Sequence, residues 1–249
     1  MYQKIKMLRV VIMTSIMLLT CTLSAQPTLV KKWDKSFGGI YGEKFEKLIL
    51  MYDGGYLLAG ESSSITSGNK SQTVYDTVTY SFDLWIVRLD SNGNKLWDKQ
   101  YGSNETDLLV DVIALKSGDI MLSAFTRADS SFDLTMPKFE NSYNPDVWLV
   151  KLDQNGLKVW DKRYGGHGVD DNSFLVELQS GVIALAGRTN SDTSINISKP
   201  PFGGMDYWFL FIDSNGNYLK DFRYGGDGNE KSKLLCNDFR WWVYFSWRV

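Results

Sequence analysis

The sequence predicts an all-β chain built from repeated four-stranded antiparallel units. Three observations lead to this prediction. Successive copies of one Trp-containing motif lie 64, 63 and 60 residues apart, and a fixed spacing of this length is typical of repeat architectures. Strand-like runs rich in aromatic and β-branched residues end in turns that contain Asn and Gly. No helical periodicity of useful length follows residue 25.

The repeat is clearest at its Trp and Asp residues. The motif Trp33-Asp34-Lys35 recurs as Trp97-Asp98-Lys99 and Trp160-Asp161-Lys162, with a degraded copy at Lys220-Asp221-Phe222. An Asp-x-Trp motif begins at Asp83, Asp146 and Asp206, and an Asp-x-Asn-Gly motif begins at Asp90, Asp153 and Asp213. Six of the nine Trp therefore fill two repeat positions: Trp33, Trp97 and Trp160 at one, and Trp85, Trp148 and Trp208 at the other.

The four strands of a unit are predicted in order around these motifs. The Asp-x-Trp strand, residues 84–89 in the first copy, enters the Asp-x-Asn-Gly turn, where Asn and Gly tolerate the positive φ of a tight hairpin. The return strand carries Trp97. A Gly-rich crossover leads to the next strand, residues 109–115, and a turn such as Asp53-Gly54-Gly55 precedes the fourth, residues 56–60. A polar insert of about 20 residues then leads back to the Asp-x-Trp strand.

Successive connections of an antiparallel meander emerge at alternate ends of the strands. The two tight turns of each unit are therefore expected on one face, and the Gly-rich crossovers and polar inserts on the other. Long, variable loops on a rigid scaffold are the usual place for binding. We expect any ligand site on this second face.

Four-stranded units at a fixed spacing predict an incomplete β-propeller with four-stranded antiparallel blades. A buried Trp removes about 150–250 Å² from water, and one small sheet cannot cover two such rings. The six Trp are therefore expected to pack between neighbouring blades. Residues 26–235 are assigned to the propeller, as an N-terminal strand around Trp33, three complete units from Glu43 and the start of a fourth. In an intact propeller the Trp33 strand is expected to close the ring by joining the last blade, but this chain is not expected to close a ring alone.

The combined pattern, Asp-x-Trp followed by Asp-x-Asn-Gly and Trp-Asp-Lys-x-Tyr-Gly-Gly, resembles the repeat of secreted propellers of the Bacteroidota. The resemblance covers residues 31 to 235. The run from Asp90 through Gly93 to Trp97 is similar to the tryptophan-docking hairpin of quinoprotein propellers, with a spacing one residue shorter. These resemblances imply a propeller fold and carry little biochemistry.

The first 25 residues predict export. Lys4, Lys6 and Arg9 precede an apolar run at residues 10–19 and a short stretch of small and polar residues, which is typical of a signal peptide cleaved after Ala25. Lipid attachment at Cys21 is the alternative. The expected location is secreted or cell-surface, with no stable membrane span after cleavage, because the apolar run is shorter than the ~20 residues that cross a bilayer.

Charge limits the expected partners. Beyond residue 25 the chain has 27 − 3 = 24 Lys and Arg against 29 Asp and Glu. This mildly acidic body argues against a nucleic-acid partner, which requires a concentrated basic surface. A glycan or protein ligand outside the cell is expected instead.

The pattern is lost in residues 236–249, which we interpret as an out-of-frame tail. Trp241, Trp242 and Trp247 have the spacing of Gly54, Gly55 and Gly60, and a Trp codon followed by another Trp, Val or Arg CGN codon gives Gly when translation is shifted by one nucleotide. Permitted codons for the tail then encode AMTSDGGYILAGG, the strand and turn that the repeat requires. The hypothesis is a frameshift near residue 235.

No catalytic residues, cofactor or metal site are predicted. His167 is the only His, so a multi-histidine metal centre is excluded, and Asp-x-Asn-Gly lacks the Gly and Glu positions of an EF-hand. Weak ligand-binding candidates on the long-loop face are His167, Asp170, Asp171, Tyr80 and Tyr143. The sequence favours a non-catalytic binding or structural module. The alternative is a propeller enzyme that acts on polysaccharide or is a quinoprotein-like oxidoreductase.

Overall fold

The computed structural model describes residues 31–139 and 143–230. The chain divides into two compact units, Met1–Asp34 and Lys35–Val249, and every strand found in the described residues belongs to the second. The predicted signal peptide and out-of-frame tail lie outside the described residues. Within the described ranges there is no helix, and accordingly none that is long and apolar enough to cross a membrane.

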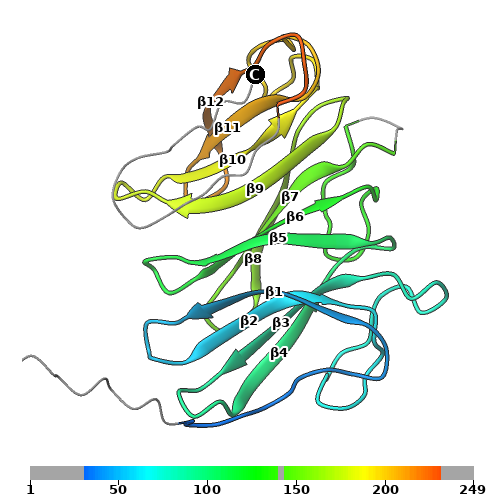
Figure 1. The fold of residues 1–249 in the computed structure, drawn as a ribbon, viewed down its shortest axis with the longest axis vertical. Helices are drawn as coiled ribbons and strands as arrows, with labels where there is room; N and C mark the ends of the chain where they lie inside the picture. The colour runs from blue at the N-terminus through cyan, green and yellow to red at the C-terminus, as the bar shows by residue number, and fades with distance from the viewer. Residues whose placement is uncertain (1–30, 140–142, 231–249) are drawn as a thin grey trace, which may run out of the picture. The chain divides into compact units, whose positions relative to one another are not determined.

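In the described residues, twelve strands form three separate four-stranded antiparallel sheets, here called the first, second and third blades (Figure 1). The first blade contains β1 (Glu43–Leu50), β2 (Tyr56–Ser62), β3 (Asp83–Leu89) and β4 (Lys95–Tyr101). The second contains β5 (Asp107–Ala114), β6 (Ile120–Thr126), β7 (Asp146–Leu152) and β8 (Lys158–Tyr164). The third contains β9 (Asp170–Glu177), β10 (Ile183–Thr189), β11 (Asp206–Ile212) and β12 (Tyr218–Tyr224).

Each blade is a meander in which neighbours in sequence are neighbours in the sheet. The predicted all-β class, with antiparallel blades of an incomplete propeller, is confirmed, and the predicted strands differ from the observed ones by no more than two residues at either end. One predicted element differs more. Residues 31–42 contain no strand, so Trp33 lies outside any sheet of the described chain.

The Asp-x-Asn-Gly turns are held by their own aspartates. Asp90 Oδ1 accepts hydrogen bonds from the backbone N–H groups of Asn92 and Asn94, both at 2.8 Å. Gly93 has a φ of 76°, a conformation that glycine adopts without steric cost. The same bonds recur at Asp153 and Asp213. These carboxylates are committed to backbone capping, as expected of a hairpin turn.

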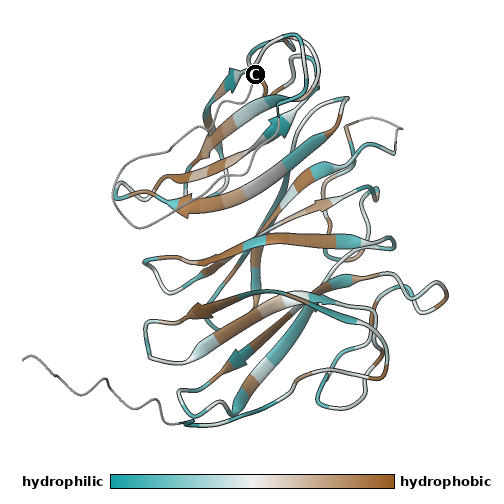
Figure 2. Cartoon of the chain, in the orientation of Figure 1, coloured by the Kyte–Doolittle hydropathy of each residue, from teal (hydrophilic) through white to brown (hydrophobic). Residues whose placement is uncertain are grey.

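Two apolar clusters fill the spaces between blades. The first joins the first and second blades, with Leu84 and Ile86 packed in the same cluster as Val112 and Trp148. The second joins the second and third blades around Tyr164, Leu175 and Trp208 among others. Apolar residues accordingly lie along the strands, and hydrophilic ones predominate in the connections (Figure 2).

The fourth strand of one blade docks on the Asp-x-Asn-Gly turn of the next. Tyr101 donates its hydroxyl hydrogen bond to the Gly156 carbonyl at 2.5 Å, and Tyr164 donates to Gly216 at 2.6 Å. A Cβ added to Gly156 would lie 2.9 Å from the Trp97 ring. Trp97 and Trp160, each half-buried, thus cover the glycine of the following turn. Their place between blades agrees with the predicted packing.

The other Trp position is also buried, and two of its three members, Trp148 and Trp208, belong to the clusters between blades. Trp85 is 6% exposed, and Trp148 and Trp208 are fully buried. The Trp85 indole N–H donates to Asp98 Oδ2 at 3.0 Å, and that of Trp148 donates to Asp161 at 3.2 Å. In the first and second blades, the Asp of the Trp-Asp-Lys motif therefore accepts a hydrogen bond from the Trp of the neighbouring strand.

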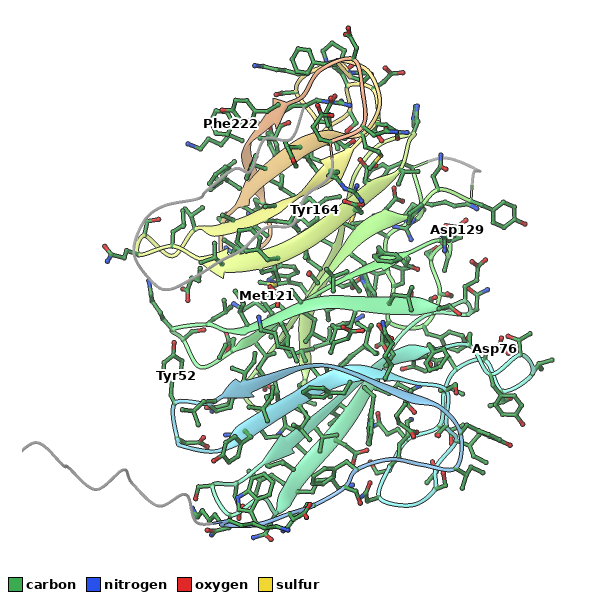
Figure 3. The ribbon with its side chains drawn as sticks, in the orientation of Figure 1. Tyr52, Asp76, Met121, Asp129, Tyr164 and Phe222 are labelled. Atoms are coloured by element: carbon green, nitrogen blue, oxygen red, sulfur yellow. The ribbon has the colours of Figure 1, made fainter. Side chains whose placement is uncertain are left out.

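The connections divide between two faces. Tyr52, in a tight turn, lies at one edge of the blades, whereas Asp76 and Asp129, in the polar inserts, lie at the opposite edge (Figure 3). We call these edges the tight-turn face and the long-loop face. The predicted separation of tight turns from crossovers and inserts is therefore present in the structure.

Candidate ligand-binding site on the long-loop face

A carboxylate at the start of each first strand shapes the Gly-rich crossover before it. Asp107 Oδ2 accepts the Ser103 N–H at 2.6 Å, and Asp170 Oδ2 accepts the Gly166 N–H at 2.7 Å. The bond recurs at Glu43 and at Glu230, in each case from the residue four positions earlier. Asp107 and Asp170 are fully buried. These buried carboxylates hold the backbone of the crossovers in place. They do not reach the surface of the long-loop face, where the inserts are exposed.

The polar inserts are attached to the crossovers by further hydrogen bonds. In the second blade, Ser131 and Leu134 form an isolated β-bridge. The Asn104 N–H donates to Ser131 Oγ at 3.1 Å, and Asp133 N–H donates to the Gly102 carbonyl at 3.1 Å. The insert therefore has a defined position over the junction between the first and second blades.

A pocket of about 390 Å³ lies at this junction, on the long-loop face. We call it the inter-blade pocket. Its lining comes from the insert of the first blade, from the crossover and from the residue that follows β6. The lining residues are Asp76, Thr79, Ser81, Asn104, Glu105, Thr106 and Arg127. Its size falls within the usual range of small-molecule sites, about 300–1,000 Å³.

Three of the lining side chains have unused hydrogen-bonding capacity. Ser81 is 9% exposed, and its Oγ has no hydrogen-bond partner within the described ranges. The exposed side chains of Arg127 and Glu105 make no ion pair or hydrogen bond with any described residue. Asp76 differs, because its carboxylate caps Val78 and Thr79 and its pKa is lowered by the Thr79 hydroxyl and backbone hydrogen bonds.

Two tyrosines are adjacent in sequence to residues that line this pocket. Tyr80 stands between the lining residues Thr79 and Ser81, and its ring centroid lies 4.8 Å from that of Tyr41. Tyr75 precedes the lining residue Asp76, and its ring stacks on that of Phe132 with centroids 4.4 Å apart and ring planes 13° apart. Tyr80 and Phe132 are the only non-glycine residues with positive φ in the described chain, at 54° and 48°. Such strain is concentrated at functional sites in proteins.

A second cavity of about 370 Å³ lies on the tight-turn face, between the second and third blades. Its charged groups already have partners. Lys151 Nζ lies 3.0 Å from Asp119 Oδ2, and Glu177 Oε2 accepts the Lys116 N–H at 2.7 Å. The inter-blade pocket is the better candidate site, because the Ser81, Glu105 and Arg127 side chains that line it have no partner among the described residues.

The structure separates the residues that the sequence proposed as ligand-binding candidates. His167 is exposed in the crossover. Asp170 is buried, with Ser191 Oγ donating to it at 2.8 Å, and Asp171 is paired with Arg188 on β10. Tyr143 is 83% exposed in the insert of the second blade. Tyr80 is the one candidate next to the inter-blade pocket.

Sequence reasoning missed Ser81, Glu105 and Arg127. None of them lies in a repeated motif, and their meeting depends on the alignment of two different blades. A signal was present, because Arg127 directly follows a buried strand, at a position occupied by Ser63 and Asn190 in the other two blades. An unmatched charge at a repeat position is a reason to look for a site.

The fold and this site define the chain as a β-propeller-like repeat protein with a polar pocket between two of its blades. No protein-family model matches the chain. A stretch of 164 residues, 65% of the chain, is 22% identical to the regulatory protein FlaEY of Caulobacter vibrioides and covers 17% of that protein. The chain therefore spans less than a fifth of this relative.

Proposed function

We propose that the protein is a secreted or cell-surface β-propeller module that binds a glycan or protein ligand through its long-loop face. The observation that carries the proposal is the inter-blade pocket, where Ser81 Oγ is buried without a partner among the described residues. A buried hydroxyl without a hydrogen bond costs about 1–3 kcal/mol. A ligand that supplies the missing hydrogen bond recovers this free energy.

The difference between the two faces supports the location of the site. On the tight-turn face the capping and docking contacts repeat from blade to blade, as at Asp90, Asp153 and Asp213. On the long-loop face the inserts differ in sequence and present exposed aromatic rings, including Phe132 and Tyr143. Variable loops held on a repeated scaffold are suited to recognition.

Export is the other part of the proposal and depends on the leader, residues 1–25. The positive start, short apolar run and small-residue end support translocation followed by cleavage after Ala25. Lipidation at Cys21 would place the same module on the cell surface. In both cases the long-loop face meets ligands outside the cytoplasm.

The proposal is tested by binding of the full chain to an array of extracellular polysaccharides and peptides. The double substitution Tyr80→Ala, Tyr143→Ala removes exposed rings from the long-loop face, and Tyr52→Ala removes one of similar exposure from the tight-turn face. We expect the double variant to bind at least about tenfold more weakly than the Tyr52→Ala control, a difference of about 1.4 kcal/mol. Equal losses in both variants, or no bound member of the array, would contradict the proposal.

A further inference from the structure

The charges of the inter-blade pocket restrict its ligand. Arg127 can only donate hydrogen bonds and Glu105, when ionised, can only accept them. Both line the pocket and both are free of partners in the described chain. A carboxylated ligand that paired with Arg127 would meet the carboxylates of Glu105 and Asp76. A cationic ligand that paired with Glu105 would meet Arg127.

A neutral ligand with several hydroxyl groups avoids both conflicts. Each hydroxyl donates one hydrogen bond and accepts up to two. One ring of hydroxyls can therefore accept from Arg127, donate to Glu105 and bond to Ser81. The remaining polar lining, which includes Asn104 and Thr106, offers further donors and acceptors.

Exposed aromatic rings of the long-loop face suit the apolar C–H surface of such a ligand. Tyr80 is 40% exposed beside Ser81, so part of its ring remains available for contact. Phe132, 60% exposed, keeps its left-handed backbone while its ring stacks on Tyr75. Gly68 occupies the matching position of the first blade, with a φ of 58°. The second blade thus has an exposed aromatic side chain at a position where the first blade has glycine, although the positive φ of Phe132 is strained.

We infer that the inter-blade pocket binds a neutral sugar unit of an extracellular glycan, with Arg127, Glu105 and Ser81 as its hydrogen-bonding residues. The inference rests on the proposed binding function and specifies its ligand class. It distinguishes a neutral sugar from uronic acids, from amino sugars with free ammonium groups, and from peptides.

The experiment compares saccharides that share a backbone and differ in charge. The full chain is titrated with methyl-esterified and free oligogalacturonates, and with N-acetylated and deacetylated chito-oligosaccharides, by isothermal titration calorimetry. We expect at least one neutral member to bind, and to bind at least about tenfold more tightly than its charged counterpart, because charge mismatch removes affinity without removing shape.

Substitutions then locate the bound sugar. Arg127→Gln and Ser81→Ala are each expected to weaken binding of the neutral saccharide by about fivefold or more. The first replaces the charged guanidinium and its five N–H donors with a shorter neutral amide, and the second removes the hydroxyl. Ser214→Ala, on the tight-turn face, is the matched control and should leave affinity unchanged. Thermal unfolding of each variant shows that the fold is retained.

The outcomes separate the two proposals. Equal or tighter binding of the charged members, or binding of peptides only, would overturn the neutral-sugar inference and leave the binding function in place. Neutral binding that is insensitive to Arg127→Gln and Ser81→Ala would overturn the assignment to this pocket. Failure to bind any saccharide or peptide would overturn both proposals.

Discussion

The first and second blades carry the same buried carboxylate and compensate its charge in different ways. In the second blade Asp146 Oδ2 lies 2.9 Å from Arg163 Nη1, and neither side chain is more than 4% exposed. In the first blade Gln100 occupies the Arg163 position and donates from Nε2 to Asp83 Oδ2 at 2.7 Å. Gln100 Oε1 in turn accepts a hydrogen bond from Lys70, which is 2% exposed.

This difference shows how a repeat tolerates the loss of a buried cation. Lys70 belongs to the polar insert, and its counterparts in the other blades are Leu134 and Ile197. A buried carboxylate without a nearby cation is costly. In the first blade the cation near the buried carboxylate is therefore Lys70 of the insert, whereas in the second blade it is Arg163 of the fourth strand. Insert and strand are coupled through Asp83, although they are distant in sequence.

The largest effect is expected from Arg163→Gln, which gives the second blade the strand residue of the first without its lysine. The substitution leaves Asp146 buried without a cation, so the free energy of unfolding should fall by about 3–5 kcal/mol. Urea denaturation followed by Trp fluorescence measures this change.

The double variant Arg163→Gln, Leu134→Lys sharpens the comparison, because it transfers the complete arrangement of the first blade. We expect the free energy of unfolding of the double variant to exceed that of Arg163→Gln by at least about 1 kcal/mol. A coupling of this size is typical of groups in one interaction network. Leu134→Lys alone should destabilise the protein, since Leu134 is buried in an apolar cluster. If the losses of unfolding free energy of the two single variants simply add in the double variant, the Gln and Lys arrangement of the first blade does not work in the second.

A smaller effect is expected from pH. Burial raises the pKa of Asp83 to about 8, whereas in the unfolded chain the pKa of Asp is about 3.9. Asp83 is protonated in the folded state at low pH, so its stabilising contribution is complete below pH 4 and is lost as pH rises to about 8. Asp83→Asn, which stays neutral, should reduce the fall in unfolding free energy over this window by about 1–3 kcal/mol.

Other groups define the control for this measurement. Burial also raises the pKa of Asp107 to about 6 and that of Asp146 to about 7, although Arg163 opposes the shift at Asp146. Burial lowers the pKa of Lys70 to about 8, and Lys70 stays charged in both states below that pH. Asp83→Asn should therefore retain the pH dependence below pH 7 that these carboxyl groups cause. Identical slopes in the two proteins from pH 4 to pH 8 would show that Asp83 remains ionised when folded.

The repeat made the blades predictable, because their strands, turns and docking residues recur at fixed spacing. Trp97 and Trp160 were expected between blades from the area of the indole ring alone, and they lie against Gly156 and Gly216. The strand expected at Trp33 is not observed, since no described sheet includes residues 31–42. Local pattern predicts a propensity, and pairing decides the outcome.

The candidate site was less predictable for a related reason. Sequence patterns identified the long-loop face but not the pocket on it, since Ser81 and Arg127 come from different blades and follow no motif. Asp170 illustrates the opposite error. A carboxylate beside a Gly-rich crossover suggested a surface ligand, but the side chain is buried and bonded to Gly166 and Ser191. Burial of a loop carboxylate depends on its neighbours in space, which one sequence does not show.

The smallest effect concerns the docking tyrosines at the junctions between blades. Tyr164 is 3% exposed and donates its hydroxyl hydrogen bond to the Gly216 carbonyl. Tyr164→Phe removes this bond and keeps the ring, so the free energy of unfolding should fall by about 1 kcal/mol. Urea denaturation of the two proteins measures the difference.

Tyr224 is the matched control in the third blade, because it occupies the same repeat position and is 55% exposed. Its hydroxyl makes no hydrogen bond with the described part of the chain, so Tyr224→Phe should change stability by less than about 0.5 kcal/mol. A loss at Tyr224 equal to that at Tyr164 would mean that the third blade also docks its tyrosine. The comparison therefore tests whether the repeated contact, rather than the tyrosine itself, stabilises the junction.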